Sequence, residues 1–209
     1  KTAYEMLRSL VGSEMCIRDS AKTEFNFTEI LFGFRFAYRE RILETTKGQV
    51  SLGSKYPVVY LNYTRGITGV LNGEFAFDRF DLKVEGSKYI KYVGDFSFRL
   101  MAGIILGELP ACNLYDGNGT YREFALYAPF SFGTMRTNEF LSDKYVSLFL
   151  SHNFGKLLFK EGKLFNPQFV LITNIAFGSL SHPEIHHNYD FNTLEKGYYE
   201  SGFLIRKIL

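Results

Sequence analysis

The stretch NEFLSDKYVSLFLSHNF, residues 138–154, alternates between two kinds of side chain. Every second residue from Lys144 to Phe154 belongs to a face that is apolar in its middle, where Leu148 and Leu150 lie. The residues between them, from Asp143 to Asn153, carry mostly hydroxyl and amide groups. A period of two over about ten residues is typical of a transmembrane β-strand with its polar face toward a lumen. Leu148 and Leu150 are therefore predicted to face lipid.

The clearest strand of the chain is FNFTEILFGFRFAYRERI, residues 25–42. Its aromatic residues from Phe32 to Tyr38 share one face, and Arg35 and Arg39 share the other. An arginine that faces lipid at mid-depth costs about 2–4 kcal/mol, so the arginines are predicted to point into a lumen. The alternative is an amphipathic strand of a soluble sandwich, with its arginines at the water surface. On the membrane reading, lipid contacts Phe32, Phe34 and Phe36, and the lumen contacts Arg35 and Arg39.

Similar alternation recurs along the rest of the chain. The stretch 95–107 places Phe96 and Phe98 toward lipid and Arg99 toward the lumen. The last expected strand, which begins near residue 196, places Glu200 and Arg206 toward the lumen. The remaining expected strands are 57–64, one that begins at 74, a weaker one at 124–133, one at 169–180 and one that begins near 196.

Loops are expected at 44–55, 85–90 and 107–122, where glycine and polar residues are frequent. Bacterial barrels alternate short turns with long loops, and the expected loops at 85–90 and 107–122 reverse that alternation. A miscounted strand or a loop that folds inward would restore it. About eight strands without helical stretches predict an all-β antiparallel meander.

The composition excludes two classes of protein. The chain has 24 basic and 22 acidic residues, a formal net charge of +2 and no basic stripe, which argues against a nucleic-acid partner. No stretch of about 18 apolar residues occurs, so an α-helical membrane span is excluded. Phenylalanine is abundant, at 22 residues, and tryptophan is absent. The interfacial aromatic role must then fall to tyrosine.

The order of several motifs resembles one known family. The most specific are Tyr-Thr-Arg-Gly at 63–66 and Glu-Phe-Leu-Ser-Asp-Lys-Tyr at 139–145. Residues 26–209 resemble the C-terminal barrel of Bacteroidota outer-membrane proteins whose complete members carry an N-terminal carboxypeptidase-regulatory-like domain. The resemblance implies an integral protein of the bacterial outer membrane, and it transfers no catalytic residue. Complete members have further barrel strands, so residues 21–209 are expected to form a partial barrel, an open curled sheet.

The first 20 residues differ from the rest. SLVGSEMCIRDS, residues 9–20, resembles translated sequencing-adapter read-through, and we interpret residues 1–20 as an artefactual or disordered leader. The alternative is a short native helix built on Leu7, Leu10 and Val11.

Two places suggest chemistry. Ser151 and His152 are adjacent, but neighbouring residues of a strand point to opposite faces, so they cannot form a catalytic pair there. A histidine-rich loop could hold a surface metal, but a solvated loop is the more economical interpretation. We therefore expect no catalytic residue, metal or cofactor. The residues of that loop are His182, Glu184, His186, His187 and Asp190.

The sequence therefore predicts part of an outer-membrane β-barrel in envelope transport, reception or biogenesis, without chemistry of its own. Its expected partners are membrane lipid and an unknown solute or protein. The inward charges either set solute preference or brace the barrel, and the sequence favours neither. The alternative is a soluble β-barrel or sandwich that binds a hydrophobic ligand, and a third class is a barrel-embedded lipid hydrolase. In the soluble alternative, the five phenylalanines predicted above to face lipid would instead pack in a central core. They are Phe32, Phe34, Phe36, Phe96 and Phe98.

Overall fold

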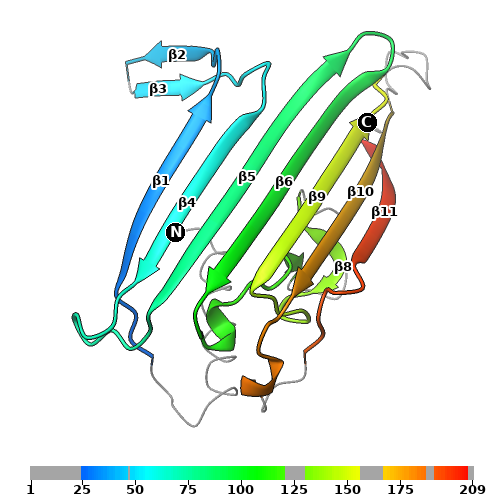
Figure 1. The fold of residues 1–209 in the computed structure, drawn as a ribbon. Coiled ribbons are helices and arrows are strands. Elements are labelled where there is room, and N and C mark those ends of the chain that lie inside the picture. The colour runs from blue at the N-terminus through cyan, green and yellow to red at the C-terminus, as the bar shows by residue number, and fades with distance from the viewer. Residues whose placement is uncertain (1–24, 47, 121–129, 156–166, 187–190, 207–209) are drawn as a thin grey trace.

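In the computed structural model, one antiparallel sheet of seven strands dominates the protein (Figure 1). The structure describes residues 25–46, 48–120, 130–155, 167–186 and 191–206. The leader expected at 1–20 lies outside them. In sheet order the strands are β1 (Glu29–Ala37), β4 (Val58–Gly66), β5 (Phe77–Ile90), β6 (Gly94–Leu106), β9 (Lys144–Asn153), β10 (Gln168–Ser179) and β11 (Tyr198–Arg206).

The sheet is open, because β1 and β11 are its two edges and do not pair with each other. The predicted fold class, an all-β antiparallel meander that does not close, is confirmed. The smaller elements are the hairpin β2 (Ile42–Thr45) and β3 (Gly48–Ser51), the short parallel pair β7 (Gly119–Thr120) and β8 (Phe132–Arg136), and the 3-10 turns η1 (Ala111–Asn113) and η2 (Pro183–Ile185). Within the described ranges, no helix has the length and apolar character that a membrane crossing requires.

Three local expectations were wrong. The expected loop at 85–90 is strand, because β5 pairs with β6 as far as Ile90, and the expected loop at 44–55 contains the β2–β3 hairpin. Of the expected strand at 124–133, the described residues 130–133 are not part of the main sheet, in which β6 pairs directly with β9. Of that segment, residues 121–129 lie outside the described part, and the rest leads into β8.

Residues 107–143 therefore connect β6 to β9, and the described parts of this connection fold back onto one face of the sheet. We call its described parts, 107–120 and 130–143, the covering segment, and the face that they contact the inner face. Phe132 and Met135 of the covering segment are fully buried there, and the Phe132 ring lies 5.1 Å from that of Phe149 on β9. The alternation of turns and loops stays reversed, because only residues 91–93 join β5 to β6, whereas the connection from β6 to β9 spans residues 107–143.

Glycines of the sheet make room for the covering segment. A Cβ added to Gly103 of β6 would overlap the Tyr115 ring, and one added to Gly178 of β10 would overlap the Ser142 hydroxyl. Tyr115 cannot easily move away, because its hydroxyl donates a 2.6 Å hydrogen bond to Asp81. Glycine inside a strand often marks such a close approach.

Gly103→Ala should therefore destabilise the protein by about 1–3 kcal/mol, the usual cost of overpacking a filled site. Gly202→Ala in β11 is the matched control, because a Cβ at Gly202 meets nothing within 4 Å. Urea unfolding in detergent micelles, followed by far-ultraviolet circular dichroism, measures both variants. Equal unfolding midpoints for the two variants would show that Tyr115 is not held against β6.

Candidate functional site

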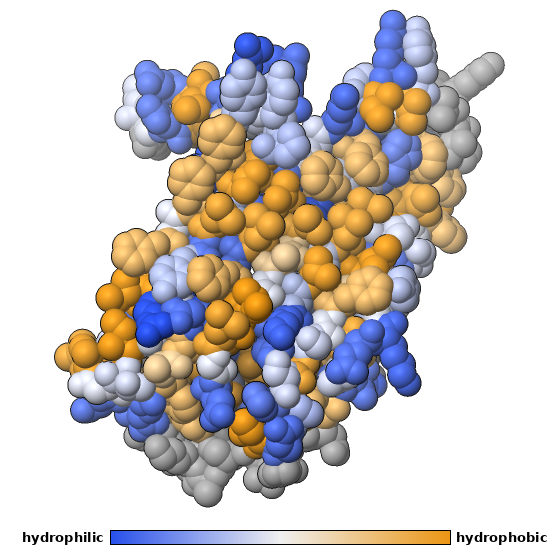
Figure 2. Space-filling view, viewed as in Figure 1, coloured by the Kyte–Doolittle hydropathy of each residue, from blue (hydrophilic) through white to orange (hydrophobic). Residues whose placement is uncertain are grey.

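The outer face, opposite to the covering segment, carries uncharged side chains across the middle of the sheet. Strand pairing aligns them in rows that run from strand to strand. Figure 2 shows hydrophobic side chains over the middle of the sheet between more hydrophilic ends. One row is Phe36, Val59, Val84, Leu100, Leu148, Ile175 and Tyr199, and the next is Phe34, Leu61, Leu82, Ala102, Val146 and Phe177.

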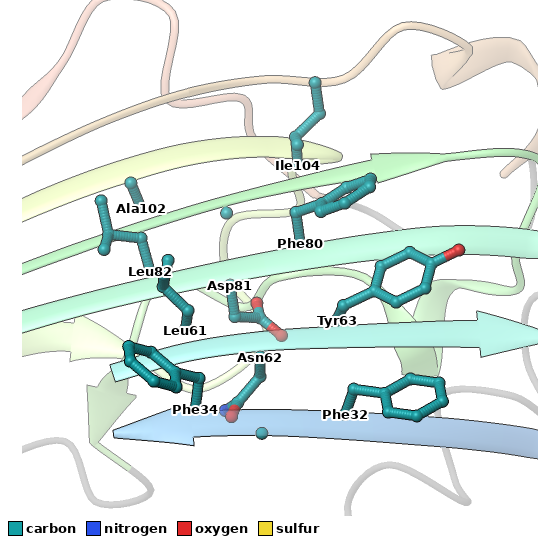
Figure 3. Close-up of a pocket in the computed structure, with 12 residues that line it drawn as sticks. Phe32, Phe34, Leu61, Asn62, Tyr63, Phe80, Asp81, Leu82, Ala102 and Ile104 are labelled. Carbon is teal, nitrogen blue, oxygen red and sulfur yellow. The ribbon is translucent and has the colours of Figure 1, made fainter. Parts of the chain in front are cut away.

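A groove of about 600 Å³ lies on this face over β1, β4, β5 and β6 (Figure 3). Its lining is almost entirely apolar. Strands β1, β4, β5 and β6 each contribute two apolar side chains to it. In the same order, the labelled apolar side chains are Phe32, Phe34, Leu61, Tyr63, Phe80, Leu82, Ala102 and Ile104.

Charged residues mark both ends of the uncharged rows. At one end Arg65 forms an ion pair with Asp78, whose carboxylate also accepts a 2.6 Å hydrogen bond from the Tyr63 hydroxyl. At the other end Lys88 of β5 and His152 of β9 belong to the same row across the sheet, because both pair with Phe96 of β6. The His152 ring nitrogen Nε2 lies 3.2 Å from the Val93 carbonyl oxygen. The outer face thus has a polar rim on each side of an uncharged band.

The inner face carries a paired charge network along β5 and β6. Arg79 lies 3.1 Å from Asp81, and Arg99 lies 2.8 Å from Glu85. Lys83, between these pairs on β5, approaches Glu85 only to 3.9 Å. Most of the charges therefore neutralise one another, and Lys83 has the weakest contact with a carboxylate.

Aromatic rings cover the cations of this network. The guanidinium carbon of Arg79 lies 4.5 Å from the Tyr115 ring centre, and that of Arg99 lies 3.8 Å from the Phe130 ring centre. Both rings belong to the covering segment, so cation–π contacts join it to the sheet. Burial raises the pKa of Tyr115, and the hydrogen bond that its hydroxyl donates to Asp81 raises it further. Tyr115 therefore stays a neutral donor.

Glu200 of β11 fixes β8 against the inner face. Its Oε2 accepts hydrogen bonds from the Thr134 backbone N–H at 2.9 Å and from the Thr134 hydroxyl at 2.7 Å. Its Oε1 accepts one from the Asn174 amide at 3.1 Å. Figure 1 shows β8 beside the lower parts of β10 and β11. Glu200 is thus a bridge between β10, β11 and the covering segment.

A second acidic residue holds the β2–β3 hairpin near the end of β1. Arg35 donates to both carboxylate oxygens of Glu40, and the Ser51 hydroxyl donates to Oε1. These hydrogen bonds, that of Arg35 above all, lower the pKa of Glu40 to about 2. Glu40 therefore carries its charge at any ordinary pH.

The residues that the sequence singled out as lumen-facing fall in two places. Four lie in strands on the inner face, whereas Arg39 lies in the turn after β1, over the Tyr38 ring. Its positive φ of 50° ends the alternation before it reaches residue 39. The four residues on the inner face are Arg35, Arg99, Glu200 and Arg206.

The residues singled out as lipid-facing all lie on the outer face. Three phenylalanines of β1 are 64%, 58% and 52% exposed, and the other four residues are half-buried within the sheet. They do not form a central core. That lipid covers them stays a prediction. In chain order these residues are Phe32, Phe34, Phe36, Phe96, Phe98, Leu148 and Leu150.

The candidates for chemistry lie apart. Ser151 and His152 point to opposite faces of β9, with Ser97 beside Ser151 on the inner face. In the histidine loop, His182 Nδ1 lies 3.1 Å from Glu184. Residues 187–190 of that loop are outside the described part, and among the described residues no three or more potential ligands group closely enough to hold a metal.

Sequence reasoning did not select the residues that hold the covering segment. Asp81 and Lys83 were recognisable as inward charges, but Tyr115, Phe130 and Thr134 lie in stretches without alternation. The one available signal was glycine inside strands, at positions such as 103 and 178, which marks close approach of another segment.

Glu200→Ala should release β8, because the carboxylate loses three hydrogen bonds and each hydrogen bond to a charged group contributes about 1.5–3 kcal/mol. We expect trypsin to cleave after Arg136 in β8 at least about tenfold faster than in the unchanged protein. Glu195→Ala is the control, since Glu195 is exposed and has no ion pair or hydrogen bond within the described ranges. An unchanged cleavage rate in Glu200→Ala would contradict the role given to Glu200.

Comparison with known proteins finds one family. Residues 17–193 match the C-terminal domain of a family of unknown function, DUF5686. The match begins inside the segment interpreted as adapter read-through. Among curated proteins and solved structures, none matches the chain.

Proposed function

The chain belongs to the family of the DUF5686 C-terminal domain, and we propose that it forms a membrane-spanning sheet of a bacterial outer-membrane β-barrel. Its expected role is in envelope transport, reception or biogenesis, without chemistry of its own. The resemblance to Bacteroidota proteins with a carboxypeptidase-regulatory-like domain supports this assignment. The partners in this proposal are membrane lipid and a solute or protein that passes or binds at the inner face.

The observation that carries the proposal is the uncharged band of the outer face. Its two central rows cross six and seven strands without one charged residue. Soluble monomers rarely expose a continuous apolar patch larger than a few hundred Å². In a bilayer the same band would be the lipid-contacting surface, and the polar rims would lie at the two interfaces.

The band also shifts along the sheet as a tilted barrel requires. Among the outer-face residues of the strand, the uncharged run on β1 extends from Ile30 to Phe36. On β11 it extends from Tyr199 to Ile205, and Tyr199 is in the same row as Phe36. The middle of the run thus moves by about six residues over six strand steps. With about 3.3 Å per residue and about 4.8 Å between strands, the strands tilt by about 35° from the membrane normal. Membrane barrels have tilts of about 35–45°.

In a membrane, the two edge strands of the sheet, β1 and β11, need further strands as hydrogen-bonding partners. Unpaired backbone groups do not face hydrocarbon, so β1 and β11 must each meet a further strand in the membrane. The soluble alternative fits the structure less well, because it places the five phenylalanines in a central core, whereas those of β1 are mostly exposed.

Val58 and Val59 of β4 provide a matched test, since both are half-buried and they point to opposite faces. Val59→Arg would place a guanidinium between Phe36 and Val84 on the outer face, whereas Val58→Arg would place it beside Glu85 on the inner face. In a bilayer we expect Val59→Arg to cost about 2–4 kcal/mol. We expect Val58→Arg to be close to neutral.

Urea unfolding from phospholipid vesicles measures both costs, and membrane fractionation of the expressed variants provides a second readout. A similar cost for the two variants, or none for Val59→Arg, would contradict the membrane proposal. The soluble alternative places this face in a core, so it predicts that Val59→Arg destabilises the protein in aqueous buffer and that the unchanged protein stays out of the membrane fraction.

A further inference from the structure

The inner face contains a cavity that the covering segment does not fill. It has a volume of about 310 Å³ and lies between β4 and β5 on one side and Tyr115 on the other. A cavity near 300 Å³ is at the lower end of the range for small-molecule sites. Its wall combines aromatic rings with amide, ammonium and carboxylate groups.

Three polar side chains that line this cavity have donors that are not committed to other groups. Asn62 makes no side-chain hydrogen bond with any residue in the described part of the chain. The Tyr60 hydroxyl oxygen accepts a long hydrogen bond from Arg35, at 3.5 Å, which leaves its own O–H available. Lys83 Nζ lies 3.9 Å from Glu85, too far for a hydrogen bond.

Strand pairing brings these donors together. Tyr60 and Lys83 are directly opposite each other on β4 and β5. The Lys83 ammonium lies 3.9 Å from the centre of the Tyr60 ring, which holds it over the ring face. Asn62 is two residues from Tyr60 on the same face of β4. Three donors therefore face one cavity from two neighbouring strands.

The surrounding charges leave Lys83 as the cation with least compensation. Glu85 is already engaged by Arg99, at 2.8 Å and 3.0 Å, and Asp81 is engaged by Arg79. Asp116 on the far wall accepts a hydrogen bond from the Asn118 backbone N–H at 3.2 Å. An acidic group opposite Lys83 disfavours ligands with several negative charges.

From this arrangement we infer that the cavity binds a small solute through one oxyanion group, a carboxylate or a phosphate. The Lys83 ammonium supplies the charge, and the Tyr60 hydroxyl and the Asn62 amide donate hydrogen bonds to the oxyanion. Asp116 and Asn118 face the rest of the solute and favour hydroxyl or amine groups there. This inference goes beyond the membrane proposal and does not depend on it.

Isothermal titration calorimetry on the full chain in non-ionic detergent, at low ionic strength, tests the site with inorganic phosphate and with acetate. We expect saturable binding of at least one probe, and the tighter probe identifies the oxyanion. Lys83→Met and Tyr60→Phe should each weaken binding about tenfold or more, because each removes one donor to a charged group. Lys83→Arg keeps the charge and should retain binding.

Lys88→Met is the matched control. Lys88 is on the same strand as Lys83 but lies on the outer face, so its loss should leave binding unchanged. Circular dichroism confirms that each variant keeps the sheet. Absence of binding of both probes, unchanged binding in Lys83→Met, or an equal loss in Lys88→Met would overturn the inference. None of these results depends on whether lipid covers the outer face, which the Val58 and Val59 variants test separately.

Discussion

Register is the constraint on which the whole structure depends. Seven antiparallel strands pair so that residues of one parity align across the sheet, from Phe36 on β1 to Tyr199 on β11. A slip of one residue in any strand would turn its charged side chains into the uncharged band and its apolar ones toward the inner face. The separation of an uncharged outer face from a charged inner face is therefore a single cooperative property of the sheet.

The covering segment gives the two halves of the inner face different characters. Over β9, β10 and β11 it forms a packed core, with Phe132 between Phe149 and Tyr198. Over β4 and β5 it leaves a polar cavity, and Tyr115 is the aromatic residue that the covering segment contributes to the cavity wall. Packed contacts hold the segment on both sides, since Leu109 and Leu114 also cluster with Phe77 of β5 and Ile105 of β6. Hydrogen bonds and cation–π contacts add to this packing. The inner face thus provides both stability and a place for a ligand.

The family assignment and the geometry bear on different questions. Membership of the DUF5686 C-terminal domain family states which proteins share this sequence pattern. The uncharged band and its shift from β1 to β11 are physical features that point to a lipid environment without reference to relatives. They agree with the resemblance found in the motifs at 63–66 and 139–145, although that resemblance covers the strands that carry the band.

Alternation within each strand was sufficient to predict the strand class of this protein and the face of each residue in β1, β6 and β9 and in β5 as far as Val84, since a period of two is a local property of the backbone. Alternation ended at Arg39, where a positive φ turned the chain. The order β6–β9, the inward fold of the covering segment and the cavity beside Lys83 are set only by the tertiary structure. They depend on contacts between residues far apart in the sequence, such as Tyr115 on Gly103 and Thr134 on Glu200, which no local pattern encodes.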